Sequence, residues 1–131
     1  MPGDTREAVL ASAKLLAGPG VEVTALGHGS DPSKVAPTDS ASYRLINRTI
    51  REVFPGAIVA PGRMIAATDS RYYDALCDSV YRFSPIRAKV ADLARFHGTN
   101  ERISESNYAE VIRFHRRLIE QSSAPVAPPA R

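Results

Sequence analysis

The stretch Arg95-Phe96-His97-Gly98-Thr99-Asn100-Glu101-Arg102-Ile103-Ser104 is the most informative part of the sequence. It places a histidine among small and polar neighbours, directly before a predicted helix start. The following residue, Gly98, adds no side chain that would cover the imidazole, so a ring nitrogen of His97 can point into a cleft. A neutral imidazole is also a good zinc ligand, at a distance of about 2.0 to 2.1 Å. His97 is therefore the candidate functional residue.

Ser104 is a suitable N-cap for a final helix with apolar residues at helical spacing. The residues predicted to face the core are Tyr108, Val111, Ile112, His115, Leu118 and Ile119, and those predicted to face solvent are Arg113, Arg116, Arg117 and Glu120. On this pattern His115 is a core histidine with its hydrogen bonds satisfied, and the arginines form a solvated face. Residues 122–131 are rich in Pro and Ala and are predicted to be a disordered tail.

Two further helices and several strands are predicted upstream. Asp4 and Glu7 form a capping box for a helix that ends at about Ala17, before Gly18-Pro19-Gly20. A second helix begins after the candidate N-caps Thr38, Asp39 and Ser40, has the apolar face Tyr43, Ile46, Ile50, Val53 and Phe54, and is stopped by Pro55-Gly56. Short apolar or alternating runs predict strands at 21–26, 57–60, 64–67 and 80–83, with a short helix from Tyr72 to Leu76.

Composition argues against several classes of protein and of site. The 131 residues are 44% hydrophobic and 24% charged, and no apolar run approaches the about 18 residues that indicate a membrane span. The net charge of +3 comes from Lys and Arg scattered among acids, which does not predict a nucleic-acid partner. Cys77 is the single cysteine, so neither an internal disulfide nor a cysteine-based zinc site can form, and we expect it to be buried. No signal peptide follows Met1, which leaves the location open, with the cytoplasm as the default.

Two more segments carry a family resemblance together with the His97 stretch: Ala67-Thr68-Asp69-Ser70-Arg71 and Tyr81-Arg82-Phe83-Ser84-Pro85. In this order and spacing, the three resemble the C-terminal end of the dinuclear zinc exopeptidases, the family of carboxypeptidase S, the acylases and succinyl-diaminopimelate desuccinylase. The carboxypeptidase S branch is the best match, from about Pro2 to Gln121. The resemblance implies an α/β fold, namely part of a catalytic domain with a mixed sheet flanked by helices.

The resemblance also implies a domain organisation. Residues 1–27 resemble the last helix and strand of the family's ferredoxin-like lid domain, through which a homodimer could form. Residues 28–37 are a linker that contains the return segment Ser30-Asp31-Pro32-Ser33. Residues 38–121 match the C-terminal part of the catalytic domain, and 122–131 remain a tail.

Roles for individual residues follow from the resemblance. His97 matches the family's final metal ligand, on one of two zinc ions about 3.5 to 4 Å apart. Thr68 and Ser70 would hold the substrate carboxylate. Capping of the short helix by Asp69 or Ser70 is the structural alternative, and the two roles can coexist. The residues that would brace these loops or orient the ligand are Asp69, Arg71, Asn100 and Glu101. Ala66-Ala67 replaces the glycine of many relatives, which puts the closeness of substrate approach in doubt, and His28 has no expected metal role.

The expected function is zinc-dependent hydrolysis of a peptide or N-acyl-amino-acid amide bond adjacent to a free carboxylate, with a small peptide or N-acyl amino acid as substrate. The family's His-x-Asp motif and its Glu-Glu pair, which holds the general base, are not in the chain. We therefore expect the isolated chain to be inactive and to bind zinc poorly. The alternative is a non-catalytic truncated gene product that acts at most as an interaction module. A small basic nucleic-acid-binding domain is a weaker third reading.

Overall fold

The computed structural model describes residues 3–27, 29–64, 66 and 68–123. Their ordered elements are the helices α1 (Arg6–Ala17), α2 (Ala41–Val53) and α3 (Glu105–Ser122) and the short 3₁₀ helices η1 (Asp69–Tyr73) and η2 (Val90–Arg95). The chain divides into two units, one of residues 1–36 and 63–80 and the other of residues 37–62 and 81–131. Each unit is described by itself.

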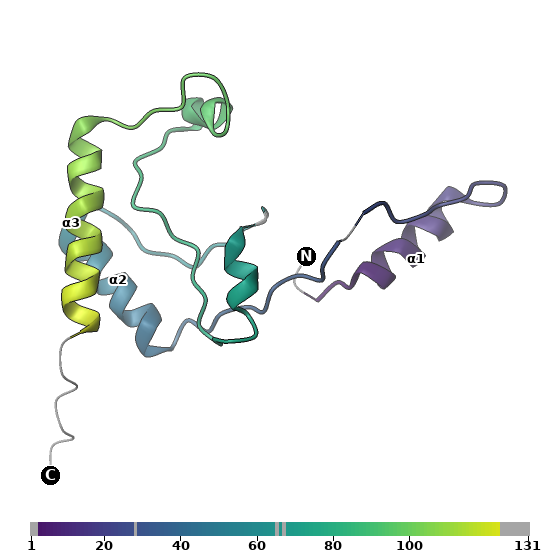
Figure 1. Ribbon diagram of the computed structural model, residues 1–131, viewed down its shortest axis with the longest axis horizontal. Coiled ribbons are helices and arrows are strands. Elements are labelled where there is room, and N and C mark those ends of the chain that lie inside the picture. Colours follow the sequence, from purple (N-terminus) through teal and green to yellow (C-terminus); the bar gives the residue numbers. More distant parts are fainter. Residues whose placement is uncertain (1–2, 28, 65, 67, 124–131) are drawn as a thin grey trace, which may run out of the picture. The chain divides into compact units, whose positions relative to one another are not determined.

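The second unit is built on α2 and α3, which pack side by side (Figure 1). Both helices begin at a predicted serine cap. The Oγ of Ser40 accepts a hydrogen bond of 3.0 Å from the N–H of Tyr43, and the Oγ of Ser104 accepts one of 3.2 Å from the N–H of Asn107. Each serine satisfies a backbone donor that the first helical turn leaves without a partner. The predicted starts of these helices are confirmed.

A small apolar core joins the two helices. Phe114 of α3 is 2% exposed, and it clusters with Ile50 and Phe54 of α2. The Phe83 ring lies 5.3 Å from the Phe114 ring at an angle of 51°, a tilted arrangement that aromatic pairs favour. Partly buried side chains surround this cluster: Ile46, Val53, Ala57, Val59 and Leu118. The predicted apolar face of α2 is confirmed.

The predicted inner face of α3 is only partly right. Val111 and Leu118 turn inward, but Tyr108, Ile112 and Ile119 are 58%, 53% and 64% exposed. The inner face instead contains the buried Asn107 and Phe114 and the half-buried Glu110 and Gln121. The prediction took every apolar position as inward, whereas α2 covers only one side of the helix. His115 is exposed and meets the Phe114 ring edge-on, so its interpretation as a core histidine was wrong.

Ion pairs with fixed hydrogen bonds join α3 to its surroundings. Arg117 donates a hydrogen bond of 2.7 Å to Glu52 of α2, and this bond is the largest cause that lowers the pKa of the Glu52 carboxyl. Arg87 forms a two-point pair with Glu110, at 2.7 and 2.9 Å, and the hydrogen bonds from Arg87 likewise lower the pKa of Glu110. Arg117 was expected on a solvated face, but it reaches across to α2.

The first unit holds α1 against the loop that follows it. The N-cap is Thr5, one residue later than the predicted Asp4, and its hydroxyl accepts a hydrogen bond of 3.1 Å from the N–H of Ala8. The Arg6 guanidinium donates hydrogen bonds to the carbonyls of Gly27, at 2.9 Å, and Gly29, at 3.3 Å. Leu16 is 87% exposed, and no residue of α1 is buried.

The predicted strands do not form among the described residues. The described parts of 21–26, 57–60, 64–67 and 80–83 run without a strand assignment. A strand is stabilised by hydrogen bonds to a neighbouring strand and by burial of one face, and Ile58 and Leu26 are 93% and 94% exposed. The sheet of the expected α/β arrangement is therefore unconfirmed. The predicted burial of Cys77 was wrong, because this cysteine is exposed.

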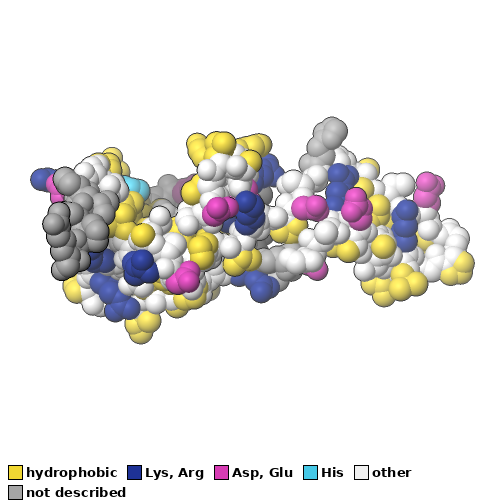
Figure 2. Space-filling view, turned by 90° about the horizontal axis from the view of Figure 1, so that it is seen from below, with side chains coloured by type: hydrophobic (Ala, Val, Ile, Leu, Met, Phe, Trp, Pro, Cys, Tyr) yellow, Lys and Arg dark blue, Asp and Glu magenta, His cyan; other side chains and the backbone are white. Residues whose placement is uncertain are grey.

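Charged and hydrophobic side chains are interspersed on the surface. On the face shown in Figure 2, Lys and Arg side chains lie among Asp and Glu and do not gather into one block, and hydrophobic side chains protrude at several places. No helix within the described residues is long and apolar enough to cross a membrane. Of the predicted tail, Ser122 ends α3 and Ser123 caps it, and residues 124–131 lie outside the described residues.

Candidate functional site

A tight turn after η2 presents His97. The N–H of Gly98 donates a hydrogen bond of 3.0 Å to the carbonyl of Arg95. Phe96 has φ −64° and ψ 120°, and His97 has φ 57°. These values are those of a type II turn, which requires a positive φ at its third residue, a place usually taken by Gly or Asn. His97 therefore occupies a left-handed conformation that a non-glycine residue adopts only at a cost of about 1 to 2 kcal/mol.

The residue after His97 must be small. A Cβ atom on Gly98 would lie 3.0 Å from the carbonyl oxygen of Ala94, a contact with backbone that cannot easily move away. The absent side chain leaves the His97 ring uncovered on that side, and His97 is exposed. The sequence argument from Gly98 thus has a steric basis.

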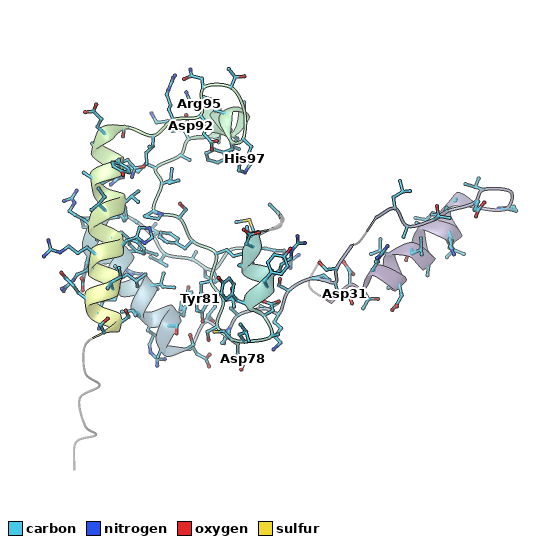
Figure 3. All side chains as sticks on the ribbon, viewed as in Figure 1. Asp31, Asp78, Tyr81, Asp92, Arg95 and His97 are labelled. Atoms are coloured by element: carbon cyan, nitrogen blue, oxygen red, sulfur yellow. The ribbon has the colours of Figure 1, made fainter. Side chains whose placement is uncertain are left out.

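A polar cluster fixes the helical turn that precedes this site (Figure 3). The Asp92 carboxylate accepts a hydrogen bond of 2.7 Å from the N–H of Lys89 and forms an ion pair with the Arg95 guanidinium. Both side chains are about three-quarters shielded, with 25% and 28% exposure. Sequence reasoning missed this cluster and η2. Its sequence signal is weak, because only the acidic half of a capping box is present: Asp92 accepts from the Lys89 N–H, but the lysine side chain cannot accept a hydrogen bond in return.

Glu101 contacts the backbone of the turn. Its carboxylate accepts a hydrogen bond of 3.2 Å from the N–H of His97. Asn100 has φ 64°, a second left-handed residue in the same loop, and Asn tolerates this region better than most residues. The loop thus folds back twice within a few residues before Ser104 starts α3. The Glu101 bond is made to the backbone of His97 and not to its ring, so the predicted orienting role of Asn100 and Glu101 stays a prediction.

The donor set around His97 does not make a metal site by itself. In the described part of the chain no group of three or more His, Cys, Asp or Glu side chains could hold a metal ion. Asp92 is engaged by Arg95 and Lys89, and Glu101 is engaged by the turn. A protein zinc site needs three or four ligands. The exposed imidazole of His97 fits one ligand position, and the chain's described residues do not supply the others.

Thr68 is the N-cap of the 3₁₀ helix η1. The Thr68 hydroxyl accepts a hydrogen bond of 3.3 Å from the N–H of Ser70 and lies 2.5 Å from the Ser70 hydroxyl, at the start of η1. Arg71 lies over the ring of Tyr72, with 5.2 Å from guanidinium carbon to ring centroid. The predicted helix from Tyr72 is thus the 3₁₀ helix η1, which begins three residues earlier at Asp69.

The predicted site residues lie in both units of the chain. Thr68, Asp69, Ser70 and Arg71 belong to the first unit, and His97, Asn100 and Glu101 belong to the second. In the first unit the named residues form the start of η1, and in the second unit they lie in the loop between η2 and α3. His28 and Ala67 lie outside the described residues.

Known proteins were compared with this chain. The family model described as peptidase family M20/M25/M40 matches residues 4–121. The N-fatty-acyl-amino acid synthase/hydrolase PM20D1 of Xenopus tropicalis is 43% identical over 110 residues, which are 83% of this chain and 21% of that protein. The probable carboxypeptidase S-like 2 of Dictyostelium discoideum is 36% identical over 102 residues, 78% of this chain and 20% of that protein. The chain spans about a fifth of the length of these relatives. No solved structure matches.

Proposed function

The chain belongs to peptidase family M20/M25/M40, and from this membership we propose that it is the C-terminal part of a zinc-dependent hydrolase. The complete enzyme cleaves a peptide or N-acyl-amino-acid amide bond adjacent to a free carboxylate. The relatives' names support both substrate classes, because one is called an N-fatty-acyl-amino acid synthase/hydrolase and another a probable carboxypeptidase S-like protein.

The left-handed backbone of His97 is the observation that carries this proposal. Conformations that cost about 1 kcal/mol or more persist where the surrounding structure enforces them, and they cluster at functional sites. Glycine would occupy this turn position without that cost. A histidine at this position, exposed and with no bulky neighbour at Gly98, suits the role of a metal ligand.

We assign the other residues around His97 to support. Glu101 holds the backbone N–H of His97, and the Asp92–Arg95 pair makes the preceding helical turn rigid. Both contacts restrain the backbone that carries the imidazole. In the complete enzyme, bound zinc would activate a water molecule, and the remaining ligands and the general base would come from outside this chain.

Thr68 and Ser70 are proposed to contact the substrate carboxylate. Both hydroxyls stand at the start of η1 beside backbone N–H groups, and hydroxyl and N–H donors suit a carboxylate. Asp69 and Arg71 then brace that loop. A homodimer through the lid domain remains part of the same proposal, on the likeness of residues 1–27 to that domain.

The decisive experiment compares two histidine variants of the complete enzyme. His97→Ala should lose one zinc ion per protomer and nearly all turnover, because the removed imidazole is a ligand. His115→Ala is the matched control, since His115 is also exposed but lies on α3, and it should retain both ions and normal turnover. Metal content is measured by inductively coupled plasma mass spectrometry. Two zinc ions and unchanged turnover in His97→Ala would overturn the assignment.

The isolated chain of 131 residues is proposed to be inactive. It offers one ligand position of the three or four that a zinc ion needs. The purified chain should therefore release no amino acid from an N-acyl substrate when zinc is added. Activity that is present in the unsubstituted chain and absent in His97→Ala would contradict this, because a contaminating hydrolase would appear in both preparations.

A further inference from the structure

A hollow of about 490 Å³ lies along α2 in the second unit. The lining carries an excess of positive charge, because three of its seven residues are arginines and only one is acidic. Its lining consists of Thr38, Tyr43, Arg44, Asn47, Arg48, Arg51 and Glu52. Neither His97 nor Thr68 belongs to this lining, so the hollow is separate from the proposed hydrolase site.

The spacing of the three arginines follows the turn of the helix. Arg44, Arg48 and Arg51 are separated by four and three residues, which places them on one side of α2, about 6 and 4.5 Å apart along its axis. Three guanidinium groups in such a row repel one another unless a negative charge lies nearby. Their common position therefore points to an anion.

Two of these arginines have neutral hydrogen-bond acceptors only, among the contacts of the described residues. Arg44 donates to the backbone carbonyl of Asp39. Arg51 donates a hydrogen bond of 2.8 Å to the side-chain oxygen of Asn47. These contacts leave the positive charges of Arg44 and Arg51 uncompensated.

The one carboxylate in the lining is engaged elsewhere. Glu52 accepts hydrogen bonds of 2.7 Å from both Arg117 and Gln121 of α3. Its approach to Arg48 is 4.0 Å, and Arg48 donates instead to the side-chain oxygen of Gln121, at 3.0 Å. Glu52 thus belongs mainly to the joint between α2 and α3. At 4.0 Å it offsets part of the charge of Arg48, and it makes no ion pair with Arg44 or Arg51 among the contacts of the described residues.

We propose that this hollow binds a phosphate group through Arg44, Arg48 and Arg51. A phosphate monoester carries about −1.5 to −2 charges at pH 7, which matches the two uncompensated arginines, whereas a single carboxylate would match one. The guanidinium fork donates two parallel hydrogen bonds to phosphate oxygens. The lining also contains two neutral donor groups, the side-chain amide of Asn47 and the hydroxyl of Thr38.

The test uses the chain as it exists, with inorganic phosphate as the first probe. Phosphate is titrated against chloride at equal ionic strength, and backbone amide shifts are followed by NMR. Saturable shifts are expected at residues 38–52. Arg44→Gln combined with Arg51→Gln should weaken binding by about tenfold or more, because both charged donors are replaced by neutral amides.

The matched control removes two positive charges outside the hollow, as Arg102→Gln combined with Arg113→Gln. It should change the affinity by less than about twofold, because these exposed arginines are not in the lining and their charges are screened by salt. An equal loss in both double variants would overturn the proposal, because phosphate would then respond to net charge alone. Circular dichroism of each variant confirms that the helices remain folded.

A second arm separates a free phosphate from a lipid headgroup. Vesicles of phosphatidylcholine with and without phosphatidic acid are sedimented with the chain. Binding to inorganic phosphate that depends on Arg44 and Arg51, without sedimentation, assigns a soluble phosphate compound. Sedimentation with phosphatidic acid that is lost in the Arg44/Arg51 double variant assigns a headgroup. Absence of both responses would refute the site and would leave the role of His97 unaffected.

Discussion

Asn107 and Arg87 are joined by a hydrogen bond of 2.8 Å, from the backbone N–H of Arg87 to the Oδ1 atom of Asn107. The Nδ2 atom of Asn107 donates in turn to the carbonyl of Pro85, at 3.1 Å. Asn107 is 2% exposed, so one buried amide satisfies two backbone groups of the chain that leads to η2. This contact fixes the extended segment to the first turn of α3.

Replacement of that amide should destabilise the second unit. In Asn107→Ala the carbonyl of Pro85 and the N–H of Arg87 lose their partner, which costs about 1 to 3 kcal/mol. Urea unfolding followed by circular dichroism measures the change. Tyr108→Ala, at the exposed neighbouring position, should change the free energy of unfolding by less than about 0.5 kcal/mol. Equal effects of the two substitutions would contradict the buried role of Asn107.

The two sides of α3 should respond differently to truncation. Phe114→Ala removes the most buried core side chain and should cost about 3 to 5 kcal/mol, whereas Ile112→Ala, at 53% exposure, should cost less than about 1 kcal/mol. Phe114→Leu is the milder variant if Phe114→Ala does not fold. Urea midpoints give the ranking. A larger loss for Ile112→Ala than for Phe114→Leu would show that the opposite side of α3 faces the core.

The turn at His97 predicts an unusual effect of glycine. His97→Gly and His97→Ala both remove the imidazole, but only glycine accepts φ 57° without strain. The glycine variant of the isolated chain should therefore be more stable than the alanine variant by up to about 1 kcal/mol. Melting temperatures at equal protein concentration measure this difference. A less stable glycine variant would mean that His97 is not held in the left-handed region.

Acid should loosen the joint between the helices. The pKa of the Glu110 carboxyl is lowered chiefly by its hydrogen bonds from Arg87, and that of Glu52 chiefly by its bond from Arg117. Their stabilising effect is thus complete above the ordinary value of 4.5, and it is lost as the pH falls through the lowered folded-state pKa values. The melting temperature should decline below about pH 4.5.

A double variant tests the source of that decline. Glu52→Gln combined with Glu110→Gln should be less stable at pH 7 and should lose less stability between pH 5 and pH 3, because the titrating groups are gone. The control is Glu22→Gln in the first unit, which should follow the unsubstituted chain. An unchanged acid slope in the double variant would assign the pH dependence to other carboxyl groups.

In the complete enzyme, Thr68 should affect substrate binding and not metal content. Thr68→Ala removes a hydroxyl that is proposed to contact the substrate carboxylate, so KM should rise or kcat/KM should fall by about tenfold, with both zinc ions retained. Thr68→Ser retains a hydroxyl and should restore much of the loss. Steady-state kinetics and zinc analysis are measured on the same preparations. Loss of zinc in Thr68→Ala would show that Thr68 supports the metal site instead.

Local signals in the sequence predicted the helices well. Ser40 and Ser104 cap α2 and α3 as expected, because a hydroxyl beside an apolar repeat satisfies a local backbone donor and needs no distant partner. Gly18 ends α1 for another local reason, because glycine accepts the positive φ of 76° at the helix end. These features depend on only a few neighbouring residues.

Features that depend on distant partners were harder to predict. An extended run such as 57–60 becomes a strand only if another strand lies beside it, and the sequence does not say which one. Apolar periodicity marked Ile112 and His115 as inward, but it could not say that α2 covers only the other side of α3. Asp92 and Arg95 were missed because their pairing follows from η2, which no apolar repeat announces. The metal-binding role of His97 stays a prediction, although the exposed position of its side chain beside Gly98 is a local feature of the kind that the sequence indicates.

The contact between Tyr43 and Tyr81 gives the protein an optical reporter of its own. The sequence has five tyrosines and no tryptophan. The rings of Tyr43 and Tyr81 lie 5.7 Å apart at 51°, and the Tyr81 hydroxyl is fixed by its bond to the carbonyl of Pro37, whereas the other three tyrosines are more than half exposed: Tyr72, Tyr73 and Tyr108. Near-ultraviolet circular dichroism arises from aromatic rings in fixed asymmetric surroundings. The near-ultraviolet tyrosine band therefore reports whether the contact between Tyr43 at the start of α2 and Tyr81 is intact. The far-ultraviolet signal reports the helix content instead.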